Sequence, residues 1–163
     1  MNEAGHRAVA VGDPAPDFAL PDQSGIVRRF SEIRSRDGVP GPAVLYFYPG
    51  NFTPICTKEA CAFRDAYSDF VDAGATVIGV SSDTAESHAR FAGAMRLDFT
   101  LLSDSTGDVR RLYGVPKSFG LFAGRVTYVI DAAGIVRLVY NAPLRAGRHV
   151  RSALELVRSL AFR

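Results

Sequence analysis

The stretch that decides the fold is Ala43-Val44-Leu45-Tyr46-Phe47-Tyr48-Pro49-Gly50-Asn51-Phe52-Thr53-Pro54-Ile55-Cys56-Thr57-Lys58-Glu59-Ala60-Cys61. It holds both cysteines of the 163-residue chain. The apolar residues 43–48 predict a buried strand, which Pro49 and Gly50 end. Thr53 and Pro54 then predict a helix start, because a hydroxyl residue favours the N-cap and proline favours the first helical position.

Cys56 is the candidate nucleophile of this stretch. With Thr53 as the N-cap, Cys56 falls at the third helical position. A sulfur there lies among backbone N–H groups without helical partners, at the positive end of the helix dipole. Both features favour the thiolate, which is the nucleophilic form of cysteine. A buried structural cysteine is the alternative, but a helix start directly after a strand favours the reactive thiol.

Composition indicates one globular domain over residues 11–163, preceded by a loose tail at residues 1–10. Charged residues make up 22% of the chain and hydrophobic ones 47%. The net charge is only +2 and the arginines are scattered, as at Arg110 and Arg111, so we expect solvated surface and no nucleic-acid partner. No apolar run approaches the roughly 20 residues of a membrane span, and the polar N-terminus lacks a signal-peptide region. We therefore expect a cytoplasmic protein whose two cysteines serve redox or metal chemistry.

The order of predicted elements is that of a mixed sheet with helices on both faces. Strands are predicted at residues 17–20 and 26–30 (a hairpin), 43–48, 75–81, 100–102, and 125–130 with 135–140 (a second hairpin). A short helix or turn is predicted at residues 31–36, followed by a loop at 37–42. Longer helices are predicted at residues 54–73, 84–94 with Asp83 as its cap, 106–113 and 150–162.

The pattern Pro49-x-x-x-Thr53-x-x-Cys56 resembles the peroxidatic-cysteine motif of the peroxiredoxins. A second cysteine five residues on, Cys61, resembles the Q-type subgroup, also called bacterioferritin comigratory proteins. The likeness extends from residues 11–18 to the C-terminal helix. It implies an α/β thioredoxin-like fold with a central mixed sheet, flanking helices and an N-terminal hairpin. It also implies a thiol-dependent peroxidase for hydrogen peroxide and organic hydroperoxides, a monomer or homodimer recycled by thioredoxin or a similar dithiol protein.

The resemblance gives the two cysteines different roles. Cys56 becomes a sulfenic acid, and Cys61 condenses with it to form a disulfide. In an intact helix, residues five apart have Cα atoms about 8.6 Å apart and face about 140° apart around the axis. A disulfide needs Cα atoms closer than about 7 Å. The bridge therefore requires the first turns of the helix to unwind.

Further site residues also follow from the resemblance. The Thr53 hydroxyl would bond the thiolate or the peroxide oxygen, beside a purely structural role as N-cap. Pro49 would shield the thiolate, beside ending the strand. Arg125 would be a fixed cation that stabilises the thiolate, although most arginines near strand edges are surface residues. Glu59 and Tyr48 would support Arg125 or line the pocket, with solvated-helix and core roles left open.

Two departures from the family pattern lie close to the thiol. Asn51 stands where an acidic residue is frequent, and Ile55 where glycine is frequent, and both bear on substrate preference more than on the reaction class. The bulkier Ile55 favours apolar alkyl hydroperoxides as substrates. The three histidines, His6, His88 and His149, match no metal-ligand spacing. No glycine-rich phosphate loop is present, so we expect no metal and no nucleotide cofactor.

Two other functions remain as alternatives to the peroxidase. One is a thioredoxin-fold disulfide reductase or isomerase, against which the lack of a Cys-x-x-Cys motif argues. The other is a non-enzymatic redox sensor or holdase on the same scaffold. Peroxide-dependent turnover would distinguish the peroxidase from both.

Overall fold

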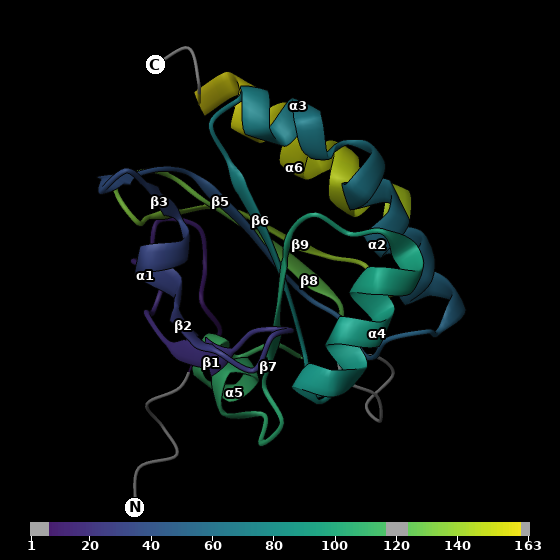
Figure 1. Ribbon diagram of the computed structural model, residues 1–163. Coiled ribbons are helices and arrows are strands. Elements are labelled where there is room, and N and C mark those ends of the chain that lie inside the picture. The colour runs from purple at the N-terminus through teal and green to yellow at the C-terminus, as the bar shows by residue number, and fades with distance from the viewer. Residues whose placement is uncertain (1–6, 117–123, 161–163) are drawn as a thin grey trace, which may run out of the picture.

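A five-stranded mixed sheet forms the centre of the computed structural model (Figure 1). The structure describes residues 7–116 and 124–160. The strand order is β7 (Thr100–Ser103), β6 (Thr76–Ser81), β5 (Ala43–Phe47), β8 (Val126–Ile130) and β9 (Val136–Asn141). β5, β6 and β7 run parallel, whereas β8 is antiparallel to both β5 and β9. The predicted mixed sheet is therefore confirmed.

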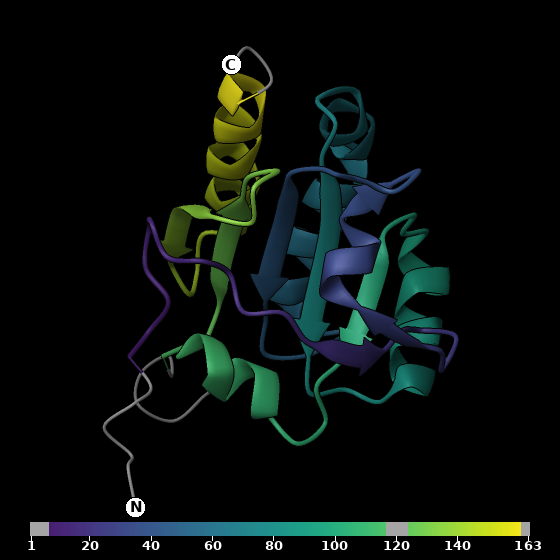
Figure 2. The same cartoon turned by 90° about the vertical axis from the view of Figure 1, so that its left-hand side faces the viewer.

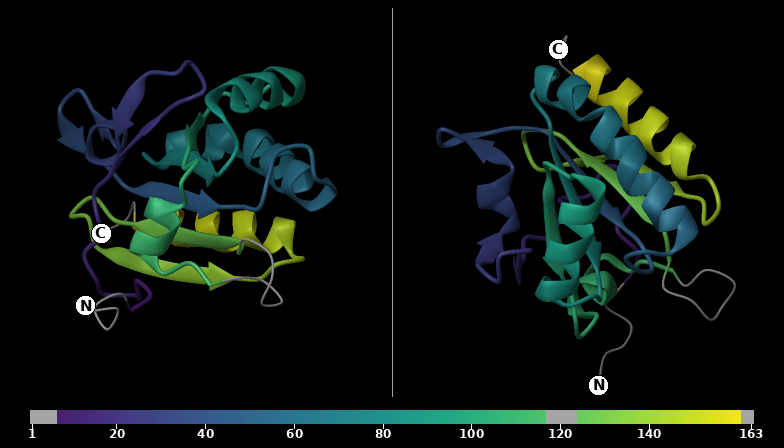
Figure 3. Two further views of the ribbon diagram at one scale, coloured as in Figure 1. Left: turned by 90° about the horizontal axis from the view of Figure 1, so that it is seen from below. Right: turned by 45° about the vertical axis from the view of Figure 1, so that its right-hand side comes forward.

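Helices cover one face of the sheet, and shorter elements cover the other (Figures 2 and 3). The first face carries α2 (Pro54–Asp65), α3 (Tyr67–Asp72), α4 (Ala85–Met95) and α6 (Ala146–Leu160). The second carries the hairpin of β1 (Ala19–Pro21) and β2 (Val27–Arg29), with α1 (Phe30–Ile33) and α5 (Asp108–Tyr113). α2 and α6 lie side by side, which Figure 3 shows clearly.

The central strand β5 is buried on both faces, which explains its apolar sequence. Val44 and Tyr46 point into the core under α2, α4 and α6. Leu45 and Phe47 point into the second core, under the hairpin and α5. This alternation follows from the two-residue period of a strand. A strand covered on both sides loses the polar positions that a solvated face would have.

The structure corrects several predicted boundaries. The helix predicted over residues 54–73 is divided into α2 and α3 at Ala66, where φ is −93° and ψ is 1°. Thr84, not Asp83, caps α4, because its hydroxyl accepts a bond from Ser87 N at 3.1 Å. The Asp83 carboxylate instead bonds Ser81 and Asn51.

Smaller differences lie at the edges of the fold. The predicted loop at residues 37–42 contains β4 (Val39–Pro40), which pairs with β3 (Ser35–Arg36) in a two-residue ribbon. α6 begins at Ala146, one turn before the predicted start, and residues 161–163 of the prediction lie outside the described residues. Near the N-terminus, Val9 N donates to Tyr113 O at 2.9 Å. None of the described helices has the length and apolar character needed to cross a bilayer.

Candidate active site

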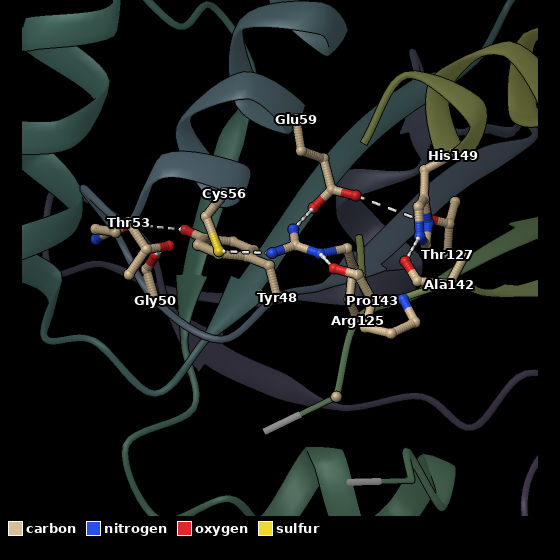
Figure 4. Close-up of polar contacts among 12 residues, drawn as sticks. Tyr48, Gly50, Thr53, Cys56, Glu59, Arg125, Thr127, Ala142, Pro143 and His149 are labelled. Atoms are coloured by element: carbon tan, nitrogen blue, oxygen red, sulfur yellow. Dashed lines mark hydrogen bonds and ion pairs between the residues drawn. The ribbon is translucent and has the colours of Figure 1, made fainter. Parts of the chain in front are cut away.

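Cys56 lies where the sequence predicts, at the third position of α2 after a sharp turn from β5 (Figure 4). Thr53 occupies the N-cap position with φ −75° and ψ 149°. Phe52, just before it, adopts φ +65°, a conformation that costs a non-glycine residue on the order of 1–3 kcal/mol. The Cys56 side chain is only 1% exposed. The sulfur therefore sits in a buried setting at a locally strained helix start.

Arg125 brings a positive charge to the Cys56 sulfur. Its Nη2 donates to Cys56 Sγ at 3.1 Å, and its Nη1 donates to Glu59 Oε1 at 2.6 Å. A third bond, from Nε to Pro143 O at 2.9 Å, fixes the guanidinium from the other side. The side chain is 3% exposed, so Arg125 is not the surface residue that its sequence position alone would suggest.

Sheet register brings these distant residues together. Phe47, the last residue of β5, pairs with Val126, the first of β8. Arg125 therefore lies beside the end of β5, where the chain turns toward α2. Glu59 lies one helical turn after Cys56, so both side chains reach the same guanidinium from one helix. Of the roles left open for Glu59, the structure supports contact with Arg125.

A second layer of buried groups surrounds the Glu59 carboxyl. Its Oε2 lies 3.7 Å from His149 Nδ1 and has no hydrogen-bond partner among the described residues. His149 Nε2 bonds Ala142 O at 2.7 Å, and Nδ1 bonds Thr127 Oγ1 at 2.7 Å. A carbonyl only accepts, so the ring proton is on Nε2 and Nδ1 accepts from the threonine hydroxyl.

Burial shifts the pKa of both titratable groups in this layer toward the neutral form. It raises the pKa of Glu59 to about 7, although the charge of Arg125 opposes the shift. It lowers the pKa of His149 to about 4, and the positive charge of Arg125 acts in the same direction. Folding therefore raises the pKa of Glu59 and lowers the pKa of His149, and both changes favour the uncharged form of the group.

Thr53 and Tyr48 make different bonds from those that the resemblance implies. The Thr53 hydroxyl donates to Gly50 O at 2.9 Å, so its proton is not directed at the Cys56 sulfur. The Thr53 hydroxyl accepts no capping bond from the backbone N–H groups of α2 within the described residues, and its one bond is the one to Gly50 O in the preceding turn. The Tyr48 hydroxyl donates to Asn51 Oδ1 at 2.6 Å rather than supporting Arg125. Pro49 is half-buried directly after β5, as its strand-ending role requires.

Asn51 ties the loop before α2 to the start of α4. Its backbone N donates to Asp83 Oδ2 at 2.8 Å. Its side-chain Nδ2 lies 3.2 Å from Ser87 Oγ and 2.9 Å from His88 Nδ1. An amide at this position donates and accepts at once, which a carboxylate could not do. The departure from the family pattern at Asn51 therefore has a structural role here.

Arg110 is a site residue that the sequence prediction missed. We expected solvated surface there, but its guanidinium donates to Tyr48 O at 3.1 Å and to Gly124 O at 2.9 Å. It also lies over the Phe47 ring, 5.8 Å from the centroid. Arg110 thus links Gly124, the residue before Arg125, to Tyr48, the residue after β5. Nothing local in the sequence distinguishes Arg110 from the neighbouring Arg111, which is exposed.

Cys61 lies further along the same helix and faces away from Arg125. Its side chain is half-buried, and its sulfur contacts Met95 Sδ on α4 at 3.9 Å. Both cysteines are free thiols. α2 is continuous from Pro54 to Asp65, so the helical geometry that separates residues five apart applies. The structure is therefore that of the reduced protein with the active-site helix wound.

The described residues contain no group of three or more histidine, cysteine, aspartate or glutamate side chains able to hold a metal ion. His88 and His149 lie in separate hydrogen-bond networks, and His6 lies outside the described residues.

Comparison with known proteins supports the same chemistry. Residues 11–139 match the AhpC/TSA family. The chloroplastic peroxiredoxin Q of Sedum lineare is 46% identical over 153 residues, which cover 93% of this chain and 80% of the relative. The Arabidopsis thaliana chloroplastic peroxiredoxin Q is 45% identical over 149 residues, covering 91% and 67%.

Solved structures agree with the curated relatives. The crystal structure of peroxidoxin BcpB from Mycobacterium tuberculosis superposes with a TM-score of 0.84 at 39% identity, covering 93% of this chain and 98% of that one. A bacterioferritin comigratory protein of Xanthomonas campestris, studied for alkyl peroxide reduction, gives a TM-score of 0.76 at 26% identity, covering 88% and 92%.

These comparisons correct one prediction and decide between the alternatives. The prediction of a cytoplasmic location, made from the polar N-terminus, is wrong, because the curated plant relatives are named chloroplastic. The disulfide reductase and the non-enzymatic sensor are not favoured, since the relatives and solved structures are peroxiredoxins. By sequence, by fold and by the surroundings of its helix-start cysteine, the chain belongs to the AhpC/TSA family as a peroxiredoxin of the Q type, a thiol-dependent peroxidase that takes a peroxide substrate and a thiol reductant.

Proposed function

We propose that Cys56 is the residue that attacks the hydroperoxide. Its thiolate sulfur bonds to the terminal peroxide oxygen, the O–O bond breaks, and the other oxygen leaves as an alkoxide or hydroxide that takes up a proton. Sulfur is oxidised to a sulfenic acid and the peroxide is reduced to an alcohol or water. Hydrogen peroxide and organic hydroperoxides both fit this step.

The observation that carries the proposal is the buried contact between Arg125 Nη2 and Cys56 Sγ at 3.1 Å. A guanidinium in a water-poor site stabilises the thiolate, and its remaining donor capacity suits the negative charge that develops on the leaving oxygen. Glu59 and the Pro143 carbonyl hold it in one orientation. In this proposal Pro49 limits water near the sulfur, and Thr53 re-orients its hydroxyl toward bound peroxide.

Cys61 completes the cycle in the proposed mechanism. Its thiol attacks the sulfenic sulfur of Cys56, a water molecule leaves, and a disulfide forms. A dithiol protein of the thioredoxin type then reduces the disulfide. Both cysteines lie on α2, so one thioredoxin-like domain over residues 11–163 is sufficient for turnover, in a monomer or a homodimer.

A coupled assay with hydroperoxide, thioredoxin, its reductase and NADPH tests the proposal. Wild type should consume NADPH in a peroxide-dependent manner, and Cys56→Ser should not. Cys61→Ser should complete one peroxide turnover and then fail to recycle. Substantial turnover by Cys56→Ser would show that the nucleophile is misassigned, and full recycling by Cys61→Ser would remove Cys61 from the cycle.

A further inference from the structure

A groove of about 480 Å³ runs between α2 and the start of α6, on the side of α2 that the chemistry above does not use. Its cationic lining consists of Lys58, Arg145, Arg148 and Arg151. Its apolar lining includes Ile55, Ala62 and Leu144, of which Leu144 is 63% exposed. These seven residues define what we call the basic groove.

The charge of the basic groove is not balanced by the part of the chain that the structure describes. All four cationic side chains are exposed, and none makes an ion pair with any residue in the described ranges 7–116 and 124–160. None of the described residues that line the groove is acidic. The chain as a whole has 19 lysines and arginines against 17 aspartates and glutamates, so four cations without an acid are a local concentration.

The positions of the arginines oppose helix stability. Arg145, Arg148 and Arg151 lie at the N-terminal end of α6, and its first turn contains no acidic residue. The positive end of the helix dipole favours acidic side chains in the first turn and disfavours basic ones, as at Arg145 and Arg148; Arg151 follows in the second turn. A cluster that breaks this rule without a partner in the fold indicates a role outside the fold.

The basic groove borders the segment that must react with the reductant. Ile55, Lys58 and Ala62 lie on one face of α2 because they are three and four residues apart. Cys56 directly follows Ile55, and Cys61 directly precedes Ala62. When the first turns of α2 unwind to form the disulfide, Ile55, Lys58 and Ala62 move with the segment that carries both sulfurs. Arg145, Arg148 and Arg151 belong to the start of α6, which packs against α2, so these cations remain beside that segment.

We propose that the basic groove docks the thiol reductant, a dithiol protein with an acidic surface around its reactive cysteine. This inference rests on the proposed Cys56–Cys61 cycle. The docked reductant's thiolate attacks one disulfide sulfur and forms a mixed disulfide, and its second thiol then displaces this chain's thiol. Two electrons pass, both cysteines of this chain return as thiols, and the reductant leaves oxidised. Complementary charge raises the association rate of such encounters.

The test compares two charge-reversal variants in steady-state turnover with an acidic thioredoxin. The groove variant is Arg148→Glu with Arg151→Glu. Acidic residues suit a helix N-terminus, so this variant should fold at least as well as wild type. The matched control is Arg90→Glu with Arg96→Glu, two exposed arginines of α4 and its C-cap, on the other side of α2, that also make no ion pair among the described residues.

In the groove variant we expect the KM for thioredoxin to rise by about tenfold or more at low ionic strength, with the difference shrinking as salt is added. Two rates should stay at the wild-type value: the single-turnover oxidation of Cys56 by hydrogen peroxide, and the reduction of the disulfide by neutral dithiothreitol. The control variant should keep the wild-type KM.

Three results would overturn the proposal. An unchanged KM in the groove variant would show that the cations do not contact the reductant. A raised KM in the control alone would place docking on the α4 side. A slower peroxide step with a carboxylate-bearing hydroperoxide, with reductant KM unchanged, would make the groove a substrate site. Failure of the peroxidase function itself would appear separately, as no oxidation of wild-type Cys56 by peroxide.

Discussion

Arg125 carries one positive charge and contacts two groups that can be negative, the Cys56 sulfur and the Glu59 carboxyl. Arg125→Gln should therefore reduce the thiolate fraction of Cys56 at neutral pH and slow the peroxide step by about 10²–10³-fold, the usual cost of losing one such donor. Thiolate absorbance against pH and single-turnover kinetics measure the two effects.

Glu59→Gln should be combined with Arg125→Gln in a second variant, so that no unpaired buried carboxylate disturbs folding. Arg137→Gln, which removes an exposed arginine paired with Asp131, is the control and should behave as wild type. If Arg125→Gln kept both the wild-type thiolate fraction and the wild-type rate, the contact with Cys56 would have no catalytic role.

The Glu59 carboxyl makes stability depend on pH in a direction opposite to an ordinary surface acid. Unfolded Glu59 releases its proton near pH 4.5, whereas folded Glu59 keeps it until about pH 7. The folded protein holds more protons between these values, so this contribution to stability is complete below pH 4.5 and is lost as pH rises through 7. His149, with its pKa near 4 in the fold against 6.5 unfolded, contributes stability that rises with pH over pH 4–6.5.

Chemical denaturation of wild type and Glu59→Gln at a series of pH values isolates the carboxyl. The free energy of unfolding of wild type minus that of the variant should fall by roughly 1–3 kcal/mol between pH 4.5 and pH 7. Groups elsewhere, including His149, contribute to both proteins and largely cancel in this difference. A difference that stays flat, or that rises with pH, would contradict a carboxyl held neutral by burial.

Sequence reasoning found some of these residues and missed others for identifiable reasons. Cys56 could be placed because a helix start is a local signal, carried by Thr53 and Pro54. Arg125 could be placed only through the family pattern, since nothing local separates it from a surface arginine. His149 and Arg110 could not be placed, because their partners come from β5, α2 and β8, and no local sequence spacing encodes those contacts.

At the scale of elements, α2 must be wound to place Cys56 against Arg125 and must unwind at its start for Cys56 to reach Cys61. The wound helix buries Cys56 against Arg125 and turns Cys61 toward Met95, so the disulfide requires its first turns to open. The positive φ of Phe52 stores strain at the point where opening would begin. Oxidised wild type should therefore show faster amide hydrogen exchange than reduced protein over residues 53–64.

Exchange measured by mass spectrometry on Cys61→Ser, treated with the same peroxide, is the control and should not show this acceleration. Unchanged exchange in a sample shown to contain the Cys56–Cys61 disulfide would mean that the helix accommodates the bridge without unwinding.

Elements were predicted well where their signals are local and poorly where tertiary packing decides. The run of residues 43–48 and the glycine after Ala73 gave β5 and the end of α3 closely. The break at Ala66 carries no proline or glycine, so nothing in the sequence marks it. Thr84 replaced Asp83 as the cap because Asp83 is engaged by Asn51 from a distant loop.

At the scale of the whole molecule, the sheet order converts sequence distance into contact. β8 pairs directly with β5, although six helices and strands lie between them in the chain (α2, α3, β6, α4, β7 and α5). This pairing places Arg125 beside Cys56. α6 then closes the same face and adds His149 behind Glu59. The mixed sheet could be predicted from the order of elements, whereas the pairing that assembles the site could be expected only from the family.

The most direct test of the account is to trap the oxidised residue itself. Cys61→Ser treated with one equivalent of hydroperoxide in the presence of dimedone, a reagent that reacts with sulfenic acids, should carry the label on Cys56 when digested and analysed by mass spectrometry. Cys56→Ser treated in the same way should carry none. A label on Cys61 in Cys56→Ser, formed as fast as the wild-type protein consumes peroxide, together with an unlabelled Cys56 in Cys61→Ser, would contradict the assignment of Cys56 as the peroxide-reacting thiol.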